Sequence, residues 1–149
     1  MDQFYVRKKL RLANYDYTQE NMVFVTVCVK ERKKLLGNIV DPKTEGELPT
    51  VELSEIGRVV DQFTSTVRGI EKYVVMPNHV HMIVNNSVGE NISKKLQAWK
   101  SVITRQIGVN IWQRSFYDHV IRDEEDFRIR WKYIDDNPSK WAMDKYFQR

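Results

Sequence analysis

The sequence predicts an α+β protein, a ferredoxin-like sandwich whose antiparallel sheet has helices packed on one face. The first observation is the order of segments with strand and helix patterns, which runs β, α, β-β, α, β, α. The second is the short turns between neighbouring strands, which favour antiparallel pairing. The third is the length of 149 residues, which fits one domain covering 1–149.

The expected strands are short apolar segments rich in β-branched residues, and they cover 22–29, 73–76, 79–84 and 115–122. The first of them, Met22 to Val29, is apolar on both faces and is therefore expected in the interior of the sheet. Pro77 and Asn78 separate the second strand from the third. The polar stretch 38–49 contains turn residues and is compatible with a small hairpin.

Three helices are expected from apolar residues at helical spacing. The first begins near Glu52, the second is closed by Gly108, and the third has Asp123 as its N-cap and ends near Asn137-Pro138. Their apolar stripes are Leu53, Ile56, Val59, Val60, Phe63 and Val67; Ile92, Leu96, Trp99, Ile103 and Ile107; and Phe127, Trp131 and Ile134.

Composition excludes several classes of protein. Cys28 is the one cysteine of the chain, which rules out an intrachain disulfide and a CxxC zinc site. No apolar run approaches the ~20 residues of a membrane helix, and the first residues lack the apolar segment of a secretory signal. We therefore expect a cytoplasmic protein without a membrane partner. The net charge of +4 at pH 7 is compatible with a nucleic-acid partner, but many enzymes share it.

A pair of histidines, His79 and His81, lies in the third expected strand. Because successive strand side chains point to opposite faces, both imidazoles point the same way, roughly 6.6 Å apart along the strand. Two such nitrogens can bind one divalent cation and leave positions open for a substrate. The alternative is a solvated pair at a sheet edge with no ligand.

Tyr133 and Asn137 lie one turn apart on the third helix, at the flank of its apolar stripe. If this helix docks beside the histidines, Asn137 offers a metal a neutral amide oxygen and Tyr133 offers a phenol as nucleophile. Attack on a metal-polarised phosphodiester would yield a covalent phosphotyrosine without ATP. The alternative is a half-buried boundary tyrosine, and Tyr117 is a rival nucleophile.

These segments resemble the single-tyrosine HUH transposases, in particular the REP-associated tyrosine transposases. Residues 76–84 (MPNHVHMIV) are similar to the HUH motif, 112–122 (WQRSFYDHVIR) to the segment before the last helix, and 133–138 (YIDDNP) to the nucleophile motif. Residues 11–17 (RLANYDY), followed by 24–26 (FVT), are similar to family N-termini. The likeness covers nearly the whole chain, with the motifs in the same order.

The resemblance implies an enzyme that acts on single-stranded DNA, often at hairpins that mark the ends of an element. By position, Tyr133 is the nucleophile that forms a 5′-phosphotyrosine and a free 3′-OH. His79 and His81 bind Mg²⁺ or Mn²⁺, and Asn137 is the third ligand. Some branches have Gln at the amide position, and Mn²⁺ suits two imidazoles better than Mg²⁺ does. Related transposases include dimers with shared active sites and monomers, so both remain open.

Basic residues provide candidate DNA contacts. The resemblance selects Lys100 in the second helix for a phosphate contact, and it gives the N-terminal segment a possible role in reading a short guide sequence. The candidates are Arg7, Lys8, Lys9, Arg11, Lys100 and Arg122. Solvated lysines, a frayed N-terminal tail and a structural hydrogen bond are the alternatives.

Two other functions stay open at this point. One is a non-catalytic nucleic-acid-binding ferredoxin-like module whose histidine pair is structural. The other is a metal-dependent phosphodiesterase that hydrolyses DNA without a covalent intermediate.

Overall fold

The computed structural model describes residues 20–87 and 90–138. Within them, four strands form an antiparallel sheet in the order β5-β6-β2-β7. The strands are β2 (Glu20–Cys28), β5 (Ile70–Met76), β6 (His79–Ser87) and β7 (Tyr117–Ile121). With α1 (Glu55–Thr64) and α2 (Ile92–Ile107) between them, they follow the β-α-β-β-α-β order of the ferredoxin-like motif. The predicted α+β class and antiparallel sheet are confirmed.

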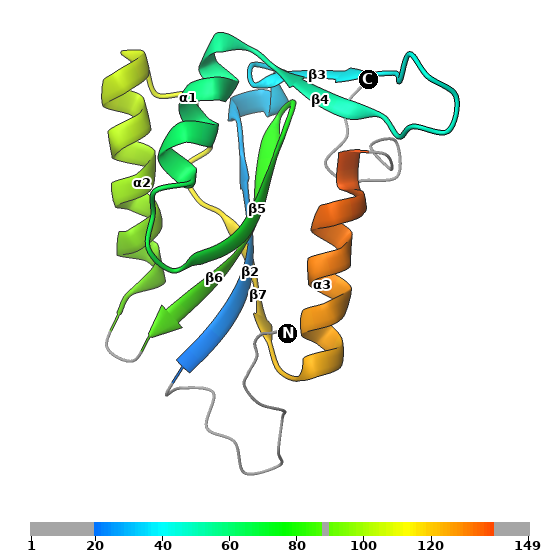
Figure 1. Cartoon of the computed structure of the whole chain (residues 1–149). Coiled ribbons are helices and arrows are strands. Elements are labelled where there is room, and N and C mark those ends of the chain that lie inside the picture. Colours follow the sequence, from blue (N-terminus) through cyan, green and yellow to red (C-terminus); the bar gives the residue numbers. More distant parts are fainter. Residues whose placement is uncertain (1–19, 88–89, 139–149) are drawn as a thin grey trace.

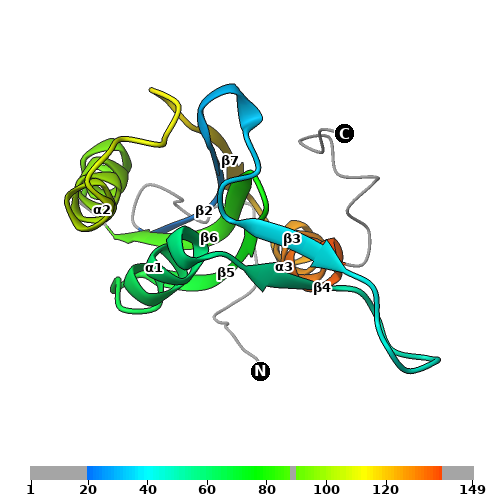
Figure 2. The same cartoon turned by 90° about the horizontal axis from the view of Figure 1, so that it is seen from above.

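The helices lie on both sides of this sheet (Figures 1 and 2). Helices α1 and α2 pack against one face, whereas α3 (Glu124–Asp136) packs against the other. The arrangement therefore departs from the expectation that all helices share one face. The physical reason is the character of β2, because a strand that is apolar on both faces needs a cover on each.

The main core lies between the sheet and the helices α1 and α2. It contains the odd-numbered valines of β2 together with Val80, Met82 and Val84 of β6. A second, smaller cluster lies under α3 and joins Phe24, Ile83, Ile121 and Ile134. Successive side chains of β2 and β6 point to opposite faces of the sheet, so they belong alternately to the two clusters. The even-numbered residues of β2 face α3.

A two-stranded sheet precedes α1 and projects beside the C-terminal end of α3 (Figure 2). Its strands are β3 (Gly37–Val40) and β4 (Thr50–Leu53), which confirms the hairpin suggested for this region. A short 3-10 turn, η1 (Lys30–Arg32), connects β2 with this hairpin.

Most predicted boundaries agree with the structure, and α1 is the main exception. The helix begins at Glu55 rather than near Glu52, because Glu52 and Leu53 pair with β3. Ser54 is its N-cap and accepts a hydrogen bond from the Gly57 amide at 3.0 Å.

The predicted end of α2 and the predicted start of α3 agree with the structure. Gly108 closes α2 with a φ of 95°. Asp123 caps α3, and its side chain accepts from the Asp126 amide at 2.8 Å. Among the helices that the structure describes, none is both long enough and apolar enough to cross a membrane.

Candidate active site

The two histidines form the centre of the candidate site. His79 and His81 are both fully buried on β6, an interior strand of the sheet, and lie on the face covered by α3. Their Nε2 atoms are 3.1 Å apart, and the two rings meet at 71°. Burial in an interior strand removes the alternative of a solvated pair at a sheet edge. The structure therefore brings two imidazole nitrogens to one point, as the strand alternation predicted.

Hydrogen bonds to the other ring nitrogens hold both imidazoles in this orientation. Asn78 donates its amide to the carbonyl of Arg32 at 3.2 Å and directs its Oδ1 to His79 Nδ1 at 2.6 Å. Since Oδ1 only accepts, His79 Nδ1 carries the hydrogen and its Nε2 offers the lone pair. His81 Nδ1 lies 2.8 Å from the hydroxyl of Thr26, its cross-strand neighbour. Such outer partners orient histidine ligands in metal sites.

The turn after β2 contributes to this arrangement. Glu31 and Arg32 both have positive φ values, 56° and 53°, which non-glycine residues adopt at an energetic cost. This backbone turns the Arg32 carbonyl toward the side chain of Asn78. The unusual conformation is therefore located where it supports the orientation of His79.

Tyr133 lies directly beside the histidines. Its ring centroid is 5.2 Å from that of His81, and the planes meet at 63°. Phe24 packs against both, stacked on His81 at 5.3 Å and edge-on to Tyr133 at 5.8 Å. Helix α3 thus docks beside the histidines, with one phenol and two imidazoles of the same chain in a single cluster.

Asn137, the C-cap of α3, has a buried acceptor at this helix end. Only 2% of the residue is exposed, and its amide nitrogen donates to the Tyr133 carbonyl at 3.3 Å. Its Oδ1 is buried and has no hydrogen-bond partner among the residues that the structure describes. A buried oxygen without a partner is costly unless something else binds it, and a cation is one such partner.

Imidazole nitrogens and an amide oxygen are donor types that a divalent cation accepts. Within 20–87 and 90–138, no three His, Cys, Asp or Glu side chains form a cluster able to hold a metal. The ligands expected for a cation here, His79, His81 and Asn137, are all neutral, and their role stays a prediction. Nitrogen ligands of this kind favour Mn²⁺ over Mg²⁺, which prefers oxygen.

Sequence reasoning did not find several residues of the same cluster. Phe24, Thr26 and Asn78 contact the histidines, yet only the strand register shows that β2 lies beside β6. Arg130 on α3 places its guanidinium carbon 5.3 Å from the centre of the Phe24 ring. Arg130 lies three residues before Tyr133 on the same side of the helix, and this spacing could have identified it from the sequence.

Two of the predicted DNA-contact residues are described by the structure. Lys100 donates to the carbonyls of Gln113, Arg114 and Ser115 at 3.0, 3.4 and 3.3 Å, and burial lowers the pKa of its ammonium. These bonds anchor the loop before β7, and a phosphate contact stays a prediction. Arg122 is exposed in the turn between β7 and α3.

The other basic candidates, Arg7, Lys8, Lys9 and Arg11, lie outside the described residues. The rival nucleophile Tyr117 is 49% exposed on the edge strand β7 and is the cross-strand neighbour of Thr26. It lies on the same face as His81 but one strand farther from it than Thr26 does.

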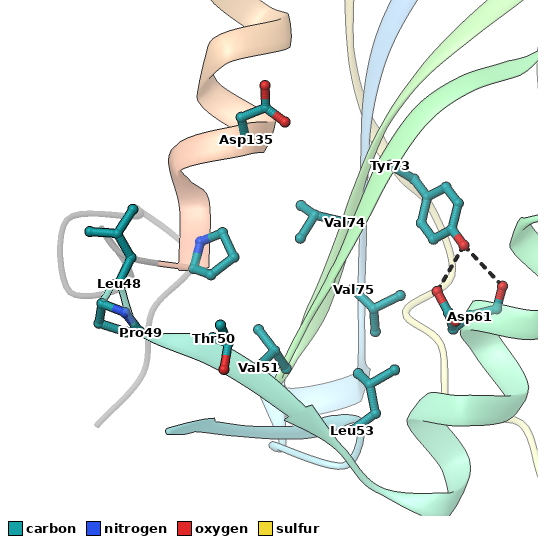
Figure 3. Close-up of a pocket in the computed structure, with 11 residues that line it drawn as sticks. Leu48, Pro49, Thr50, Val51, Leu53, Asp61, Tyr73, Val74, Val75 and Asp135 are labelled. Atoms are coloured by element: carbon teal, nitrogen blue, oxygen red, sulfur yellow. Dashed lines mark hydrogen bonds between the residues drawn. The ribbon is translucent and has the colours of Figure 1, made fainter. Parts of the chain in front are cut away.

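A separate hollow of about 520 Å³ lies between the β3–β4 hairpin, β5 and the end of α3 (Figure 3). Its wall includes Tyr73, whose hydroxyl donates to Asp61 Oδ1 at 2.7 Å. Burial, followed by the hydrogen bond to Asp61, raises the pKa of Tyr73 to about 12. Neither the histidines nor Tyr133 line this hollow, so it is distinct from the candidate site.

Comparisons with known proteins show what the chain is similar to. No family model matches the chain. An Escherichia coli K12 protein named REP-associated tyrosine transposase is 37% identical over 73 residues, which are 48% of this chain and 44% of that protein. A Haemophilus influenzae protein named only as uncharacterized is 27% identical over 95% of this chain and 93% of its own length.

A solved structure extends the likeness to the fold. It is a REP-associated tyrosine transposase bound to a REP hairpin, and it matches with a TM-score of 0.59 and 26% identity. The match covers 97% of this chain and 77% of that one. The chain is thus related, in sequence and in fold, to the REP-associated tyrosine transposases.

Proposed function

We propose that the protein is a metal-dependent transposase that cleaves and rejoins single-stranded DNA through Tyr133. The observation that carries the proposal is the approach of the Tyr133 ring to His81 at 5.2 Å, beside two Nε2 atoms 3.1 Å apart. A phosphodiester between the phenol and the imidazoles would meet a nucleophile on one side and a cation-binding site on the other. Support for the DNA substrate comes from the relative that is bound to a REP hairpin.

The proposed reaction exchanges one phosphorus–oxygen bond for another. The Tyr133 oxygen attacks the phosphorus, the bond to the 3′ oxygen breaks, and the DNA keeps a 5′-phosphotyrosine. The phenol loses its proton, and the departing oxygen gains one to become a 3′-OH. A 3′-OH that attacks the phosphotyrosine reverses the step and joins the strands, so the bond energy is conserved.

Other residues of the site would bind the cation or keep its ligands oriented. His79, His81 and Asn137 would hold Mg²⁺ or Mn²⁺. When bound, the cation would polarise the phosphodiester and stabilise charge on the departing oxygen. Asn78 and Thr26 keep the imidazoles oriented, and Phe24 packs against the rings of His81 and Tyr133.

The experiment is a search for a covalent protein–DNA adduct. The protein is incubated with Mn²⁺ and a pool of single-stranded oligonucleotides that carry a hairpin with randomised flanks, and adducts are separated under denaturing conditions. We expect an adduct that contains the DNA 3′ of the cut, together with a free strand whose 3′-OH a polymerase can extend.

Matched variants identify the nucleophile. Tyr133→Phe should lose the adduct, while Tyr117→Phe should keep it, and a chelator should prevent it in both the wild type and Tyr117→Phe. Products with hydrolysed ends and no adduct would support a phosphodiesterase instead. Salt-dependent DNA binding without either product would support a binding module.

A further inference from the structure

One side of α3 carries a line of polar residues that runs along the candidate site. Asp126, Arg130, Tyr133 and Asn137 follow each other at spacings of four, three and four residues, so they share one side of the helix. Tyr133 and Asn137 belong to the site already described. Arg130 lies in the same line, three residues before Tyr133.

Arg130 is fixed in place, and part of its guanidinium is available. Its Nε lies 3.3 Å from Asp126 Oδ1, and Asp126 in turn pairs with His119 at 2.7 Å. Asp126 is the one ion-pair partner of Arg130 among the described residues, and the side chain is 31% exposed. The two terminal nitrogens of an arginine held through Nε can donate to a further anion.

Phe24 links this arginine to the reacting groups. The guanidinium carbon lies 5.3 Å from the Phe24 ring centre, and the same ring contacts His81 at 5.3 Å and Tyr133 at 5.8 Å. The Arg130 guanidinium and the rings of Tyr133 and His81 therefore all contact the same Phe24 ring.

The chemistry of the site favours a positive group here. The imidazoles, the amide and the phenol of the site are neutral as ligands, whereas a DNA strand brings one negative charge per phosphate. An arginine presents a planar pair of donors that matches two phosphate oxygens.

We propose that Arg130 binds a backbone phosphate of the DNA strand beside Tyr133, and this inference rests on the proposed function of the site. The pairs His119–Asp126 and Asp126–Arg130 form its support and hold the guanidinium in position before DNA arrives. The competing possibility is that Arg130 only fastens α3 to Phe24.

The salt dependence of DNA binding separates the two possibilities. Each phosphate contact in a single strand contributes about 0.7 to the slope of log affinity against log salt. A short oligothymidylate is titrated in the Tyr133→Phe background, where no covalent step can interfere. Arg130→Gln should lower the magnitude of the slope by about 0.7 and weaken binding roughly tenfold. Arg130→Lys should preserve the slope because it keeps the charge.

Arg128→Gln is the matched control. Arg128 lies two residues away on the same helix, its side chain is 67% exposed, and it pairs with Glu124 at i,i+4 as Arg130 pairs with Asp126. Its loss should leave the slope unchanged. Equal slopes in the Arg130→Gln protein and the Arg128→Gln control would overturn the proposal.

A second measurement avoids dependence on the folding of Arg130→Gln. In the Tyr133→Phe protein, the arginine Nε–H signal of Arg130, assigned by its loss in Arg130→Lys, should shift when oligothymidylate is added. An unmoved signal at saturating oligonucleotide would also overturn the proposal. Neither readout requires catalysis, so a wild-type protein that forms no adduct would reject the proposed function while leaving the Arg130 result to be judged separately.

Discussion

Thr26→Val removes the hydroxyl that orients His81 and changes little else in the shape of the side chain. Thr26 is 1% exposed, and its Oγ1 lies 2.8 Å from His81 Nδ1, so the variant removes this hydrogen bond from a buried ring nitrogen. Such a loss costs about 1–3 kcal/mol of unfolding free energy. Removal of an outer partner from a histidine ligand also weakens metal affinity by about 10- to 100-fold.

Thr26→Ser is the matched variant, because it keeps the hydroxyl and loses one buried methyl group. We expect it to cost about 1 kcal/mol of stability, with Mn²⁺ affinity close to that of the wild type. The two variants therefore separate packing from orientation of the imidazole.

The assays are urea denaturation without metal and calorimetric titration with Mn²⁺. Thr26→Val should lose both stability and Mn²⁺ affinity, and Thr26→Ser should lose only stability. If the valine protein binds Mn²⁺ as tightly as the serine protein, the hydroxyl does not orient a ligand and the reasoning is refuted.

Three further outcomes are expected. Mixing Tyr133→Phe with His81→Ala should not restore adduct formation, because the phenol lies beside the histidines of its own chain; recovery in the mixture would show that two copies share a site. Since the folded pKa of Tyr73 is raised from 10.0 to about 12, its hydrogen bond to Asp61 stabilises the protein below pH 10 and is lost as pH rises toward 12. Urea denaturation between these pH values should therefore show a steeper decline in the wild type than in Tyr73→Phe, and parallel declines would contradict this. Lys100→Met should lower the unfolding free energy by about 1–3 kcal/mol through the loss of its carbonyl partners, and an unchanged urea midpoint would argue against that anchoring role.

The elements of the fold were predictable because their periodicities are local. Apolar residues on both faces of β2 indicated an interior strand, and Asp123 and Gly108 marked helix ends through capping rules that need only neighbouring residues. The start of α1 was not predictable in this way. Leu53 fits the helical stripe, but the hairpin takes it into β4, and that choice depends on pairing with a distant strand.

In the candidate site, too, the local features were predictable and the tertiary ones were not. Strand alternation placed His79 and His81 on one face, and helix spacing placed Tyr133 next to Asn137. That α3 covers the histidine face, rather than the face of the other helices, follows from tertiary packing against Phe24.

The residues that orient the histidines, Thr26 and Asn78, could not be predicted from the sequence. Thr26 meets His81 across 55 residues of chain, and Asn78 finds its second partner 46 residues away. Such contacts depend on strand register and on the turn after β2, which no local pattern specifies.

The role of Tyr133 as nucleophile is tested most directly by identifying the residue that is joined to DNA. The adduct is digested with nuclease and protease, and mass spectrometry locates the peptide that carries the remaining nucleotide. We expect a 5′-phosphate ester on Tyr133, found in the wild type and absent from Tyr133→Phe. A nucleotide linked to Tyr117 or to any other side chain would contradict it.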